Sequence, residues 1–397
     1  MTRYPVYAPD FQIQINGDPM PAAVRSVVTG VSYQDGRNAA DRVEVSIANP
    51  DLRWLQEHIR GLGFQPFPTA VKIGPVQVVN FAEGTFDIDN KLELSMGYAP
   101  DPLEHMFKGE VTGIQVSFPN GGMPSLTLVA HDYLQRLAEG TYAGGFGFLP
   151  DYLVAMILSA RNLLIPLIDP GVETISTAKA IIDIIFKGTG DKQGAACKGE
   201  SDLDFIKRLA DRYDADFWVD GDILYISRFI KEYSPRLTLT WGESLVDFTP
   251  QMSTVGQVAG VSMKFTLREL RTTFLVTVFW DFDSESLGTS IVPGVASKGP
   301  PVGGGPNFTI VDQAISSPGD IVSSALVILH KLREKLNKRL TGTGTAIGNP
   351  QIRAGAMIRL EGLGPDFSGN YRVSSATHSI DSGGYKTQFS VFKEIIP

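Results

Sequence analysis

Two stretches of this chain, 92–130 and 357–392, carry the same signals for strands and turns in the same order. Each has a Gly-x-x-Pro-Asp segment, then a Phe-x-Gly motif, a strand pattern, a Gly-Gly turn and a closing strand. A Gly-Gly turn alone is common, but ordered self-similarity is typical of a repeated structural unit. The sequence therefore predicts two copies of one β-domain that arose by internal duplication.

Period-two alternation of apolar and polar residues predicts strands in the first part of the chain, which we expect to form one domain over residues 1–145. One helix interrupts these strands, because Asn49 and Pro50 suit the N-cap and the first helical position and Gly61 suits the helix end. The clearest strand patterns lie at 11–15, 42–47, 71–73 and 92–96.

Residues 146–232 change character and predict a smaller mixed α/β domain. Ser201 with Asp204 three residues later resembles a capping box at the start of an amphipathic helix. The Asp220-Gly221 pair between two apolar runs is a strong hairpin signal. We expect helices over 152–164, 176–186 and 201–213, and a hairpin over 217–226.

Strand patterns return in residues 233–397, the predicted second β-domain. Within it, residues 284–307 are rich in glycine, proline and serine without a period, which predicts a long mobile loop or insertion rather than a packed element. A helix is predicted from residue 317 onward, with one apolar stripe. The basic cluster at 330–339 on this helix is interpreted as its solvated face.

Composition excludes several classes of protein. The formal net charge of -8 argues against a duplex nucleic-acid binder, which carries a basic stripe to neutralise phosphates. The longest apolar stretches, such as 153–158, fall short of the roughly 20 residues that cross a bilayer. The N-terminus lacks an apolar leader segment, so we expect folding in the cytoplasm. Cys197 is the only cysteine, which excludes an intrachain disulfide and a multi-cysteine metal site.

Three groups of polar residues have the composition of a catalytic or metal site but lack the full pattern. Asp281-Phe-Asp283 with Glu285 offers carboxylates for a hard cation, yet the EF-hand glycine and distal glutamate are missing. His131-Asp132 has no Gly-x-Ser-x-Gly nucleophile elbow to serve, so Asp132 is expected to cap a short helix. Acidic residues that could form a glycosidase pair lie on strands and turns, which favours solvated faces; these are Glu93, Asp101, Glu104 and Glu110. We therefore predict no enzyme activity and no catalytic, cofactor-binding or metal-binding residue.

The segment 198–213, followed by 217–225, resembles the phage late control protein D family. Residues 348–355, 362–371 and 378–385 are similar to the C-terminal part of that family, and the first 140 residues resemble it more loosely. The resemblance implies that nine residues are structural signature positions: Glu200, Asp202, Phe205, Leu209, Phe107, Gly109, Phe367, Gly369 and Tyr371.

That family includes phage baseplate hubs and is similar to the front half of the valine-glycine repeat spike proteins of type VI secretion. The resemblance implies tube-like domains separated by smaller mixed domains and arranged as a homotrimer. With the repeat, the expected fold class is a β-rich α+β protein: two tube-like β-barrel domains from an internal duplication, plus a smaller mixed α/β domain.

The function that the resemblance implies is structural: a baseplate hub of a phage tail or contractile injection system, assembled in the bacterial cytoplasm, that adapts a hexameric inner tube to a trimeric spike. The related spike proteins continue into further domains whereas this chain stops at Pro397, so we expect a separate spike protein. The inner tube protein and other baseplate proteins are the remaining expected partners. The alternative function is a tail-tip peptidoglycan hydrolase.

Overall fold

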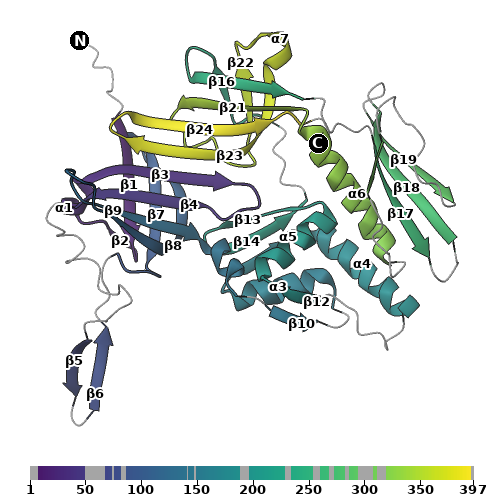
Figure 1. The fold of residues 1–397 in the computed structure, drawn as a ribbon, viewed down its shortest axis with the longest axis horizontal. Helices are drawn as coiled ribbons and strands as arrows, with labels where there is room; N and C mark the ends of the chain where they lie inside the picture. The colour runs from purple at the N-terminus through teal and green to yellow at the C-terminus, as the bar shows by residue number, and fades with distance from the viewer. Residues whose placement is uncertain are drawn as a thin grey trace.

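A computed structural model places most of the chain, and one long sheet runs beside a helical domain and a smaller sheet (Figure 1). The fold is β-rich α+β, as predicted. No helix in the part of the chain that the structure describes is both long and apolar enough to cross a membrane. The described residues are 8–49, 68–73, 76–81, 86–140, 142–146, 149–187, 196–228, 234–253, 260–267, 272–281, 286–293, 307–310 and 319–394.

The long sheet contains 13 strands from both ends of the chain. Its N-terminal strands are β1 (Ala8–Ile15), β2 (Asp18–Pro19), β3 (Val28–Gly36), β4 (Arg42–Ala48), β7 (Lys91–Ala99), β8 (Glu104–Ser117) and β9 (Ser125–Asp132). Its C-terminal strands are β15 (Leu237–Thr240), β16 (Leu245–Met252), β21 (Leu340–Ile347), β22 (Met357–Glu361), β23 (Gly369–Asp381) and β24 (Gly384–Phe392). The main path is β16-β21-β24-β23-β3-β4-β9-β8-β7-β1-β2, and β22 pairs with both β23 and β15.

Each half of the sheet has its own hydrophobic core. In β4, Val43, Val45 and Ile47 are fully buried and alternate with polar residues, which is the pattern of a strand with one covered face. The first core also takes in Ile380 and Tyr385 from the C-terminal half, so the two halves pack as well as pair. Two short helices, α1 (Ala22–Arg25) and α7 (Gly364–Phe367), flank the sheet.

The strands predicted at 11–15, 42–47 and 92–96 are confirmed as parts of β1, β4 and β7. The pattern at 71–73 lies in β5 (Pro68–Ile73), which forms a separate hairpin with β6 (Val76–Phe81). The helix predicted from Asn49 to Gly61 falls outside the described residues, apart from Asn49 itself.

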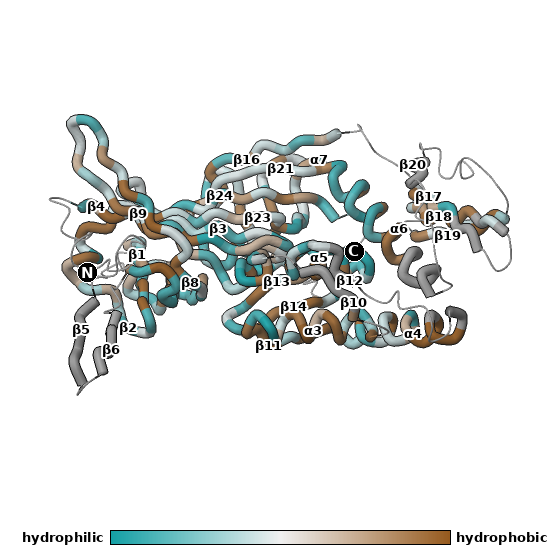
Figure 2. Tube along the Cα trace, turned by 60° about the horizontal axis from the view of Figure 1, so that its bottom comes forward, coloured by the Kyte–Doolittle hydropathy of each residue, from teal (hydrophilic) through white to brown (hydrophobic). Residues whose placement is uncertain are grey.

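The middle of the chain forms a compact helical domain with a three-stranded sheet, and Figure 2 shows apolar residues gathered along its helices. The predicted capping box is confirmed: the Ser201 hydroxyl accepts a hydrogen bond from the Asp204 N–H at 3.1 Å. The predicted hairpin is confirmed, with Gly221 at φ +57° in its turn. The elements are η2 (Tyr133–Ala138), β10 (Tyr142–Gly145), α3 (Asp151–Arg161), β11 (Ile165–Ile168), α4 (Pro170–Lys187), β12 (Ala196–Glu200), α5 (Asp202–Tyr213), β13 (Asp216–Asp220) and β14 (Ile223–Ser227).

A second, four-stranded sheet packs against a long helix in the C-terminal half, an arrangement the sequence did not predict. Val261, Met263 and Trp280 of the sheet contact Ile328 and Leu332 of the helix. The elements are β17 (Gly260–Leu267), β18 (Thr272–Asp281), β19 (Ser286–Pro293), β20 (Asn307–Ile310) and α6 (Gly319–Asn337).

The loop predicted over 284–307 is wrong in part, because residues 286–293 form β19 and pair along β18. Composition suggested a loop, but β19 is an edge strand whose residues are half-covered or exposed. Its stability therefore comes from backbone pairing more than from side-chain burial. Residues 294–306 lie outside the described part of the chain.

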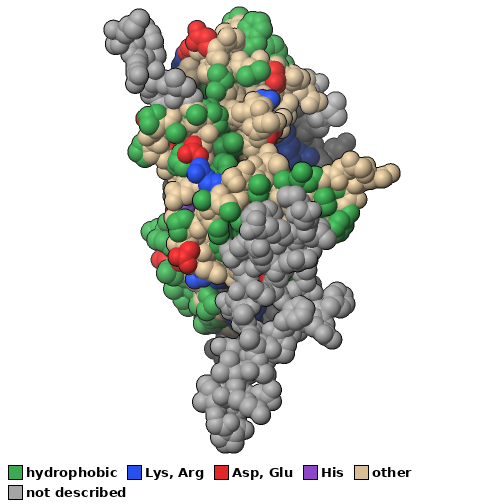
Figure 3. Space-filling model, turned by 90° about the vertical axis from the view of Figure 1, so that its left-hand side faces the viewer, with side chains coloured by type: hydrophobic (Ala, Val, Ile, Leu, Met, Phe, Trp, Pro, Cys, Tyr) green, Lys and Arg blue, Asp and Glu red, His purple; other side chains and the backbone are tan. Residues whose placement is uncertain are grey.

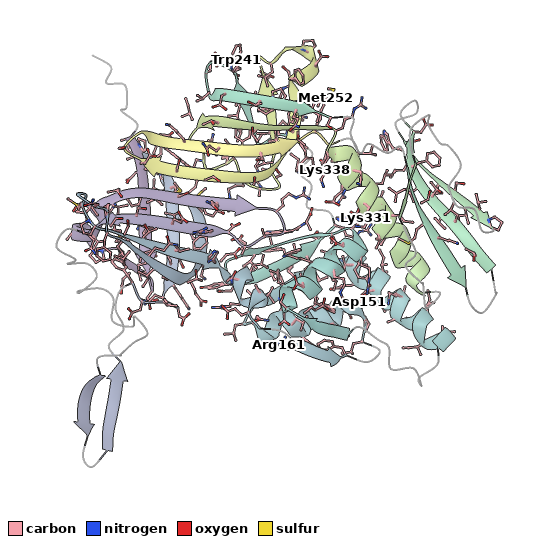
Figure 4. All side chains as sticks on the ribbon, viewed as in Figure 1. Asp151, Arg161, Trp241, Met252, Lys331 and Lys338 are labelled. Carbon is pink, nitrogen blue, oxygen red and sulfur yellow. The ribbon has the colours of Figure 1, made fainter. Side chains whose placement is uncertain are left out.

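The basic cluster on α6 is a solvated face only in part. Lys331 on the helix and Lys338 just beyond its C-terminal end are exposed, and both are labelled in Figure 4. His330 and Arg333 instead turn toward Asp214, the left-handed C-cap of α5, and contact its carboxylate at 3.0 and 2.9 Å. The long-range ion pair explains the error, since a charge run alone does not reveal a distant acidic partner.

Candidate assembly surface

Five strands of the N-terminal half and five of the C-terminal half pair in the same order. The path β3-β4-β9-β8-β7 matches β16-β21-β24-β23-β22, and all four pairings in each are antiparallel. We call these two sets of strands the first and second units.

Irregularities in the strands align the two units residue by residue. The β8–β9 ladder shifts register between Val111 and Gly113, and the β23–β24 ladder shifts between Val373 and Ser375. The hydroxyl of each bulged residue donates to a carbonyl across the ladder, Thr112 to Val129 at 3.4 Å and Ser374 to Ser390 at 3.0 Å. A β-bulge is a specific local feature, so its repetition with the same bond marks equivalent positions.

The strands at the far side of each unit show the same correspondence. The β3–β4 ladder shifts between Val28 and Gly30, and the β16–β21 ladder between Leu245 and Asp247. Val28 therefore corresponds to Leu245, and Gly30 to Asp247.

The alignment corrects one detail of the predicted repeat. Because Val111 corresponds to Val373, the counterpart of Phe107 is Gly369 rather than Phe367. In agreement, Phe107 pairs with Leu94 in β7 just as Gly369 pairs with Leu360 in β22. The two Phe-x-Gly motifs thus lie two residues out of register, because turns of different length precede them.

The two units join where β3 of the first pairs antiparallel with β23 of the second. The pairs run from Gly36 opposite Ser375 to Gly30 opposite Asp381. β23 serves two partners in succession, first β22 and, beyond its bulge, β3. We call this contact the internal seam.

A buried polar network stabilises the internal seam. The Arg353 guanidinium donates to the Asp35 carboxylate at 2.7 Å and to the Tyr33 hydroxyl at 2.6 Å. The Tyr33 hydroxyl in turn donates to the Asp41 carboxylate at 2.6 Å. Burial, followed by the charges of Asp35 and Asp41, holds the pKa of Tyr33 well above its usual range, so Tyr33 stays protonated as a donor.

His378 is the second buried polar group at the internal seam. Its Nε2 lies 2.9 Å from the Ile352 carbonyl, which assigns the ring proton to Nε2. Its Nδ1, the acceptor nitrogen of this tautomer, lies 3.0 Å from the Tyr385 hydroxyl and 3.1 Å from the Thr387 hydroxyl. Burial lowers the pKa of His378 to about 4, so the ring is neutral at physiological pH and stacks on Tyr33 at 5.8 Å.

A cavity of about 500 Å³ opens beside this network, between the first unit and the hairpin of the middle domain. Burial raises the pKa of Asp132 to about 7 and also raises the pKa of Asp41. Both carboxylates already hold structural partners, since Asp132 accepts from the Leu134 N–H at 3.1 Å and Asp41 from Tyr33. The prediction that Asp132 caps a short helix is confirmed.

The middle domain docks on the same region. The Arg37 guanidinium binds both carboxylate oxygens of Asp216 at 2.6 and 2.7 Å, and Asn38 accepts from the Phe217 N–H at 3.0 Å. Although burial alone would raise the pKa of Asp216, the Arg37 charge lowers it. The turn after β3 therefore fixes the middle domain relative to the sheet.

Each unit also contains the counterpart of the edge that the other unit uses at the internal seam. The counterpart of the β23 edge lies in β8 of the first unit, and the counterpart of the β3 edge lies in β16 of the second. Beyond Val111, the side of β8 that faces away from β9 has no partner among the strands that the structure describes. On the side away from β21, the described strands leave β16 unpaired apart from the bridge between Trp241 and Leu245. Met252 and Trp241 lie toward opposite ends of this edge (Figure 4).

The signature residues of the middle domain make structural contacts. Asp202 is buried and accepts from the Asn162 amide at 2.7 Å and from Arg161 at 3.2 Å. Phe205 and Leu209 belong to the domain core. Glu200, at the end of β12, forms an ion pair with Arg208 of α5. Their role as family positions stays a prediction.

The signature residues of the two units are likewise packed. Phe107 meets the Tyr33 ring edge-on at 6.0 Å, and Gly109 has no room for a side chain, since a Cβ there would lie 2.0 Å from the His131 carbonyl oxygen. Tyr371 is fully buried and donates to the Phe367 carbonyl at 2.7 Å. Gly369 has φ +139°, a conformation open to glycine.

The other polar candidates do not converge in the described residues. Glu110 forms an ion pair with Arg136, and His131 Nδ1 lies 2.6 Å from the Thr112 hydroxyl. Within the described residues no three His, Cys, Asp or Glu side chains are grouped as metal ligands. Asp283 and Glu285 fall outside the described part of the chain. Figure 3 shows acidic and basic side chains scattered over the sheet end of the molecule.

Sequence reasoning missed Arg353 and Asp35, because they lie 318 positions apart in the chain. It also missed Asp41, whose partner Tyr33 is close in sequence but joins the network only through the distant Arg353. It also missed the edges of β8 and β16. The signal available was modest: apolar residues at alternate positions along strands that are paired on one side only over part of their length.

The fold is shared with phage tail proteins. No family model matches the sequence, and no curated protein matches it. A 43 kDa tail protein of prophage MuSo2 from Shewanella oneidensis superposes with a TM-score of 0.59 at 12% identity, over 97% of this chain and 98% of that one.

Two further structures give the same result. A tail protein of Neisseria meningitidis MC58 has a TM-score of 0.57 at 10% identity, covering 98% of this chain and 97% of that chain. The E. coli c3393 protein, a component of the type VI secretion system, has a TM-score of 0.51 at 12% identity, covering 97% and 80%. The chain therefore has the fold of phage tail proteins, as the resemblance in the sequence predicted.

Proposed function

We propose that this chain is a structural hub of a phage tail or a related contractile injection particle. It works as a homotrimer that joins a hexameric inner tube to a separate trimeric spike protein, among other baseplate proteins, after assembly in the bacterial cytoplasm. The observation that carries this proposal is the pairing of two matched units in one sheet. Three copies hold six such units, so one ring offers six similar edges to the tube and threefold symmetry to the spike.

The tube-like barrels expected from the sequence belong to this proposal. Within one copy the described strands form an open path, because β3 of the first unit pairs with the second unit. The tube-like barrels then close only when neighbouring copies of the chain join. On this view residues 1–145 and 233–397 supply the tube wall, and residues 146–232 form the smaller domain beside it.

The test is co-expression of the full chain with its tube and spike proteins, followed by mass measurement and end-on class averages of the assembly. We expect three copies per particle and a ring with six matched units. A dimer or hexamer of this chain in the particle would contradict the proposal.

The alternative, a peptidoglycan hydrolase of the tail tip, is separated by a second measurement on the same preparation. Asp132, Asp41 and Glu110, the acidic groups best placed near a cavity or cation, are engaged in capping, hydrogen bonding and ion pairing. We expect no clearing of a peptidoglycan gel at stoichiometric dose. Clearing would replace the purely structural role with an enzymatic one.

A further inference from the structure

The unpaired edge of β8 carries apolar side chains where its counterpart is covered. Ala376, His378 and Ile380 of β23 are buried against β3 at the internal seam. Their counterparts in β8 and just after it are Ile114, Val116 and Phe118. Ile114 and Val116 are only partly buried, and Phe118 is 64% exposed.

The unpaired edge of β16 shows the same contrast. Val31, Tyr33 and Asp35 of β3 are buried at the internal seam. Their counterparts are Phe248, Pro250 and Met252, of which the first two are partly covered and Met252 is 55% exposed. All six counterparts on the two free edges are thus apolar, and none is fully buried.

We propose that copies of this chain join by strand addition, with β16 of one copy pairing antiparallel with residues 113–117 of β8 in the next. The register is the one that β3 adopts on β23. It places Gly113 opposite Ser253, Gln115 opposite Gln251 and Ser117 opposite Thr249. This inference rests on the self-association in the proposed function and specifies which residues form the contact.

Pairing satisfies two needs of the free edges together. It supplies hydrogen-bond partners for backbone N–H and C=O groups that an open edge leaves to water. It also removes the exposed parts of the six apolar side chains from water, which is favourable in proportion to the apolar area that becomes buried. Pro250 has no N–H and removes at most one hydrogen bond from the new ladder.

A second copy is the occupant because this chain carries both halves of the contact. The free part of β8 begins at its bulge, and the matching bulge in β23 is the point where that strand changes partner from β22 to β3. The free part of β16 likewise begins at its bulge, which matches the bulge in β3. Since the two edges lie on different strands, the contact is head-to-tail, and such contacts close into a ring when the rotation fits.

The test is disulfide trapping in the full-length chain with Cys197→Ala. Gln115→Cys with Gln251→Cys places one thiol on each edge, and both glutamines are exposed. The matched control inside one copy is Gln34→Cys with Thr377→Cys, two residues that pair directly at the internal seam. A shifted pair, Gln115→Cys with Thr249→Cys, sets the thiols diagonally at a distance that a disulfide spans poorly.

We expect mild oxidation of the assembled particle to link the Gln115/Gln251 pair into covalent multimers of this chain, and the internal control to form within one chain. A second in-register pair, Ser117→Cys with Thr249→Cys, should link equally. Equal linking of the shifted pair, or failure of both in-register pairs in particles shown by mass to be trimeric, overturns the register while leaving the proposed function intact. A chain that stays monomeric in the particle overturns both.

Discussion

The internal seam and the two free edges share one backbone plan but differ in chemistry. At the seam, the buried rings of Tyr33 and His378 stack, and the buried Asp35 pairs with the partly buried Arg353. At the free edges, Pro250 and Met252 stand where Tyr33 and Asp35 stand in the first unit. Buried polar groups demand exact partners whereas apolar groups do not, so the polar set selects the correct strand within a copy. We therefore expect this difference to disfavour the pairing of β16 with β23 in place of β3.

The largest effect expected at the internal seam is from Arg353→Ala. Removing this guanidinium leaves the buried Asp35 carboxylate with the Ala354 N–H but without its cation. Because Arg353 itself is only partly buried, we expect a loss of about 2 to 3 kcal/mol of unfolding free energy. Denaturant unfolding measures the loss. The matched control is Arg359→Ala nearby, whose ion pair with Glu361 is half exposed and is worth less than about 1 kcal/mol. Equal losses in the two variants would remove the distinction between the seam and the surface.

At the free edge, Met252→Lys should weaken self-association and leave the stability of the single chain unchanged. Loss of a buried methionine amounts to about 1.5 to 3 kcal/mol, or about ten- to a hundredfold in the association constant. Sedimentation across a concentration series measures this change. Ile291→Lys on β19 is the control, since Ile291 is an exposed apolar residue of an edge strand outside the long sheet. If both variants weaken association equally, the free edge of β16 has no special role.

Asp132 beside the seam predicts a dependence of stability on pH. Burial raises its pKa to about 7, so the folded state holds a proton that the unfolded state releases above about pH 4. The stability that this bound proton contributes is complete below about pH 4 and is lost as the pH rises through about 7. Asp132→Asn keeps the capping oxygen and removes the charge, so we expect it to stabilise the chain by about 2 kcal/mol at pH 8 and negligibly at pH 4. Thermal unfolding at the two pH values measures this, and an equal effect at both would contradict it.

The smallest expected effect tests the equivalence of the bulges. Thr112→Val and Ser374→Ala each remove a hydroxyl that donates across a ladder, which costs about 1 kcal/mol. The loss should be similar in the single chain, although Ser374 lies at the seam and Thr112 at a free edge. Unfolding midpoints of both variants are compared with those of Thr29→Val at the β3–β4 bulge, where the Thr29 hydroxyl donates to the Ser46 carbonyl at 3.2 Å. A large loss at one site alone would show that the two bulges are not equivalent.

Local patterns predicted much of the fold, because they act over a few residues. The alternation in β4, the Ser201 cap and the turn at Gly221 depend on neighbours in sequence. The repeat was visible as an order of turns, but its register was not, since strand alignment is set by ladder bonds and bulges. The Arg353 network and the pairing of β3 with β23 join distant segments, and no local signal specifies such contacts.

The connection between β3 and β4 spans residues 37–41, whereas the equivalent connection between β16 and β21 contains the whole four-stranded sheet and α6. The ladder on either side is the same in both cases, bulge included. Lengthening a connection costs little in chain entropy once its ends are fixed. The connection after β16 is therefore a position where an ancestral gene could acquire new sequence without disturbing the long sheet, and where a protein engineer can graft a foreign domain for display.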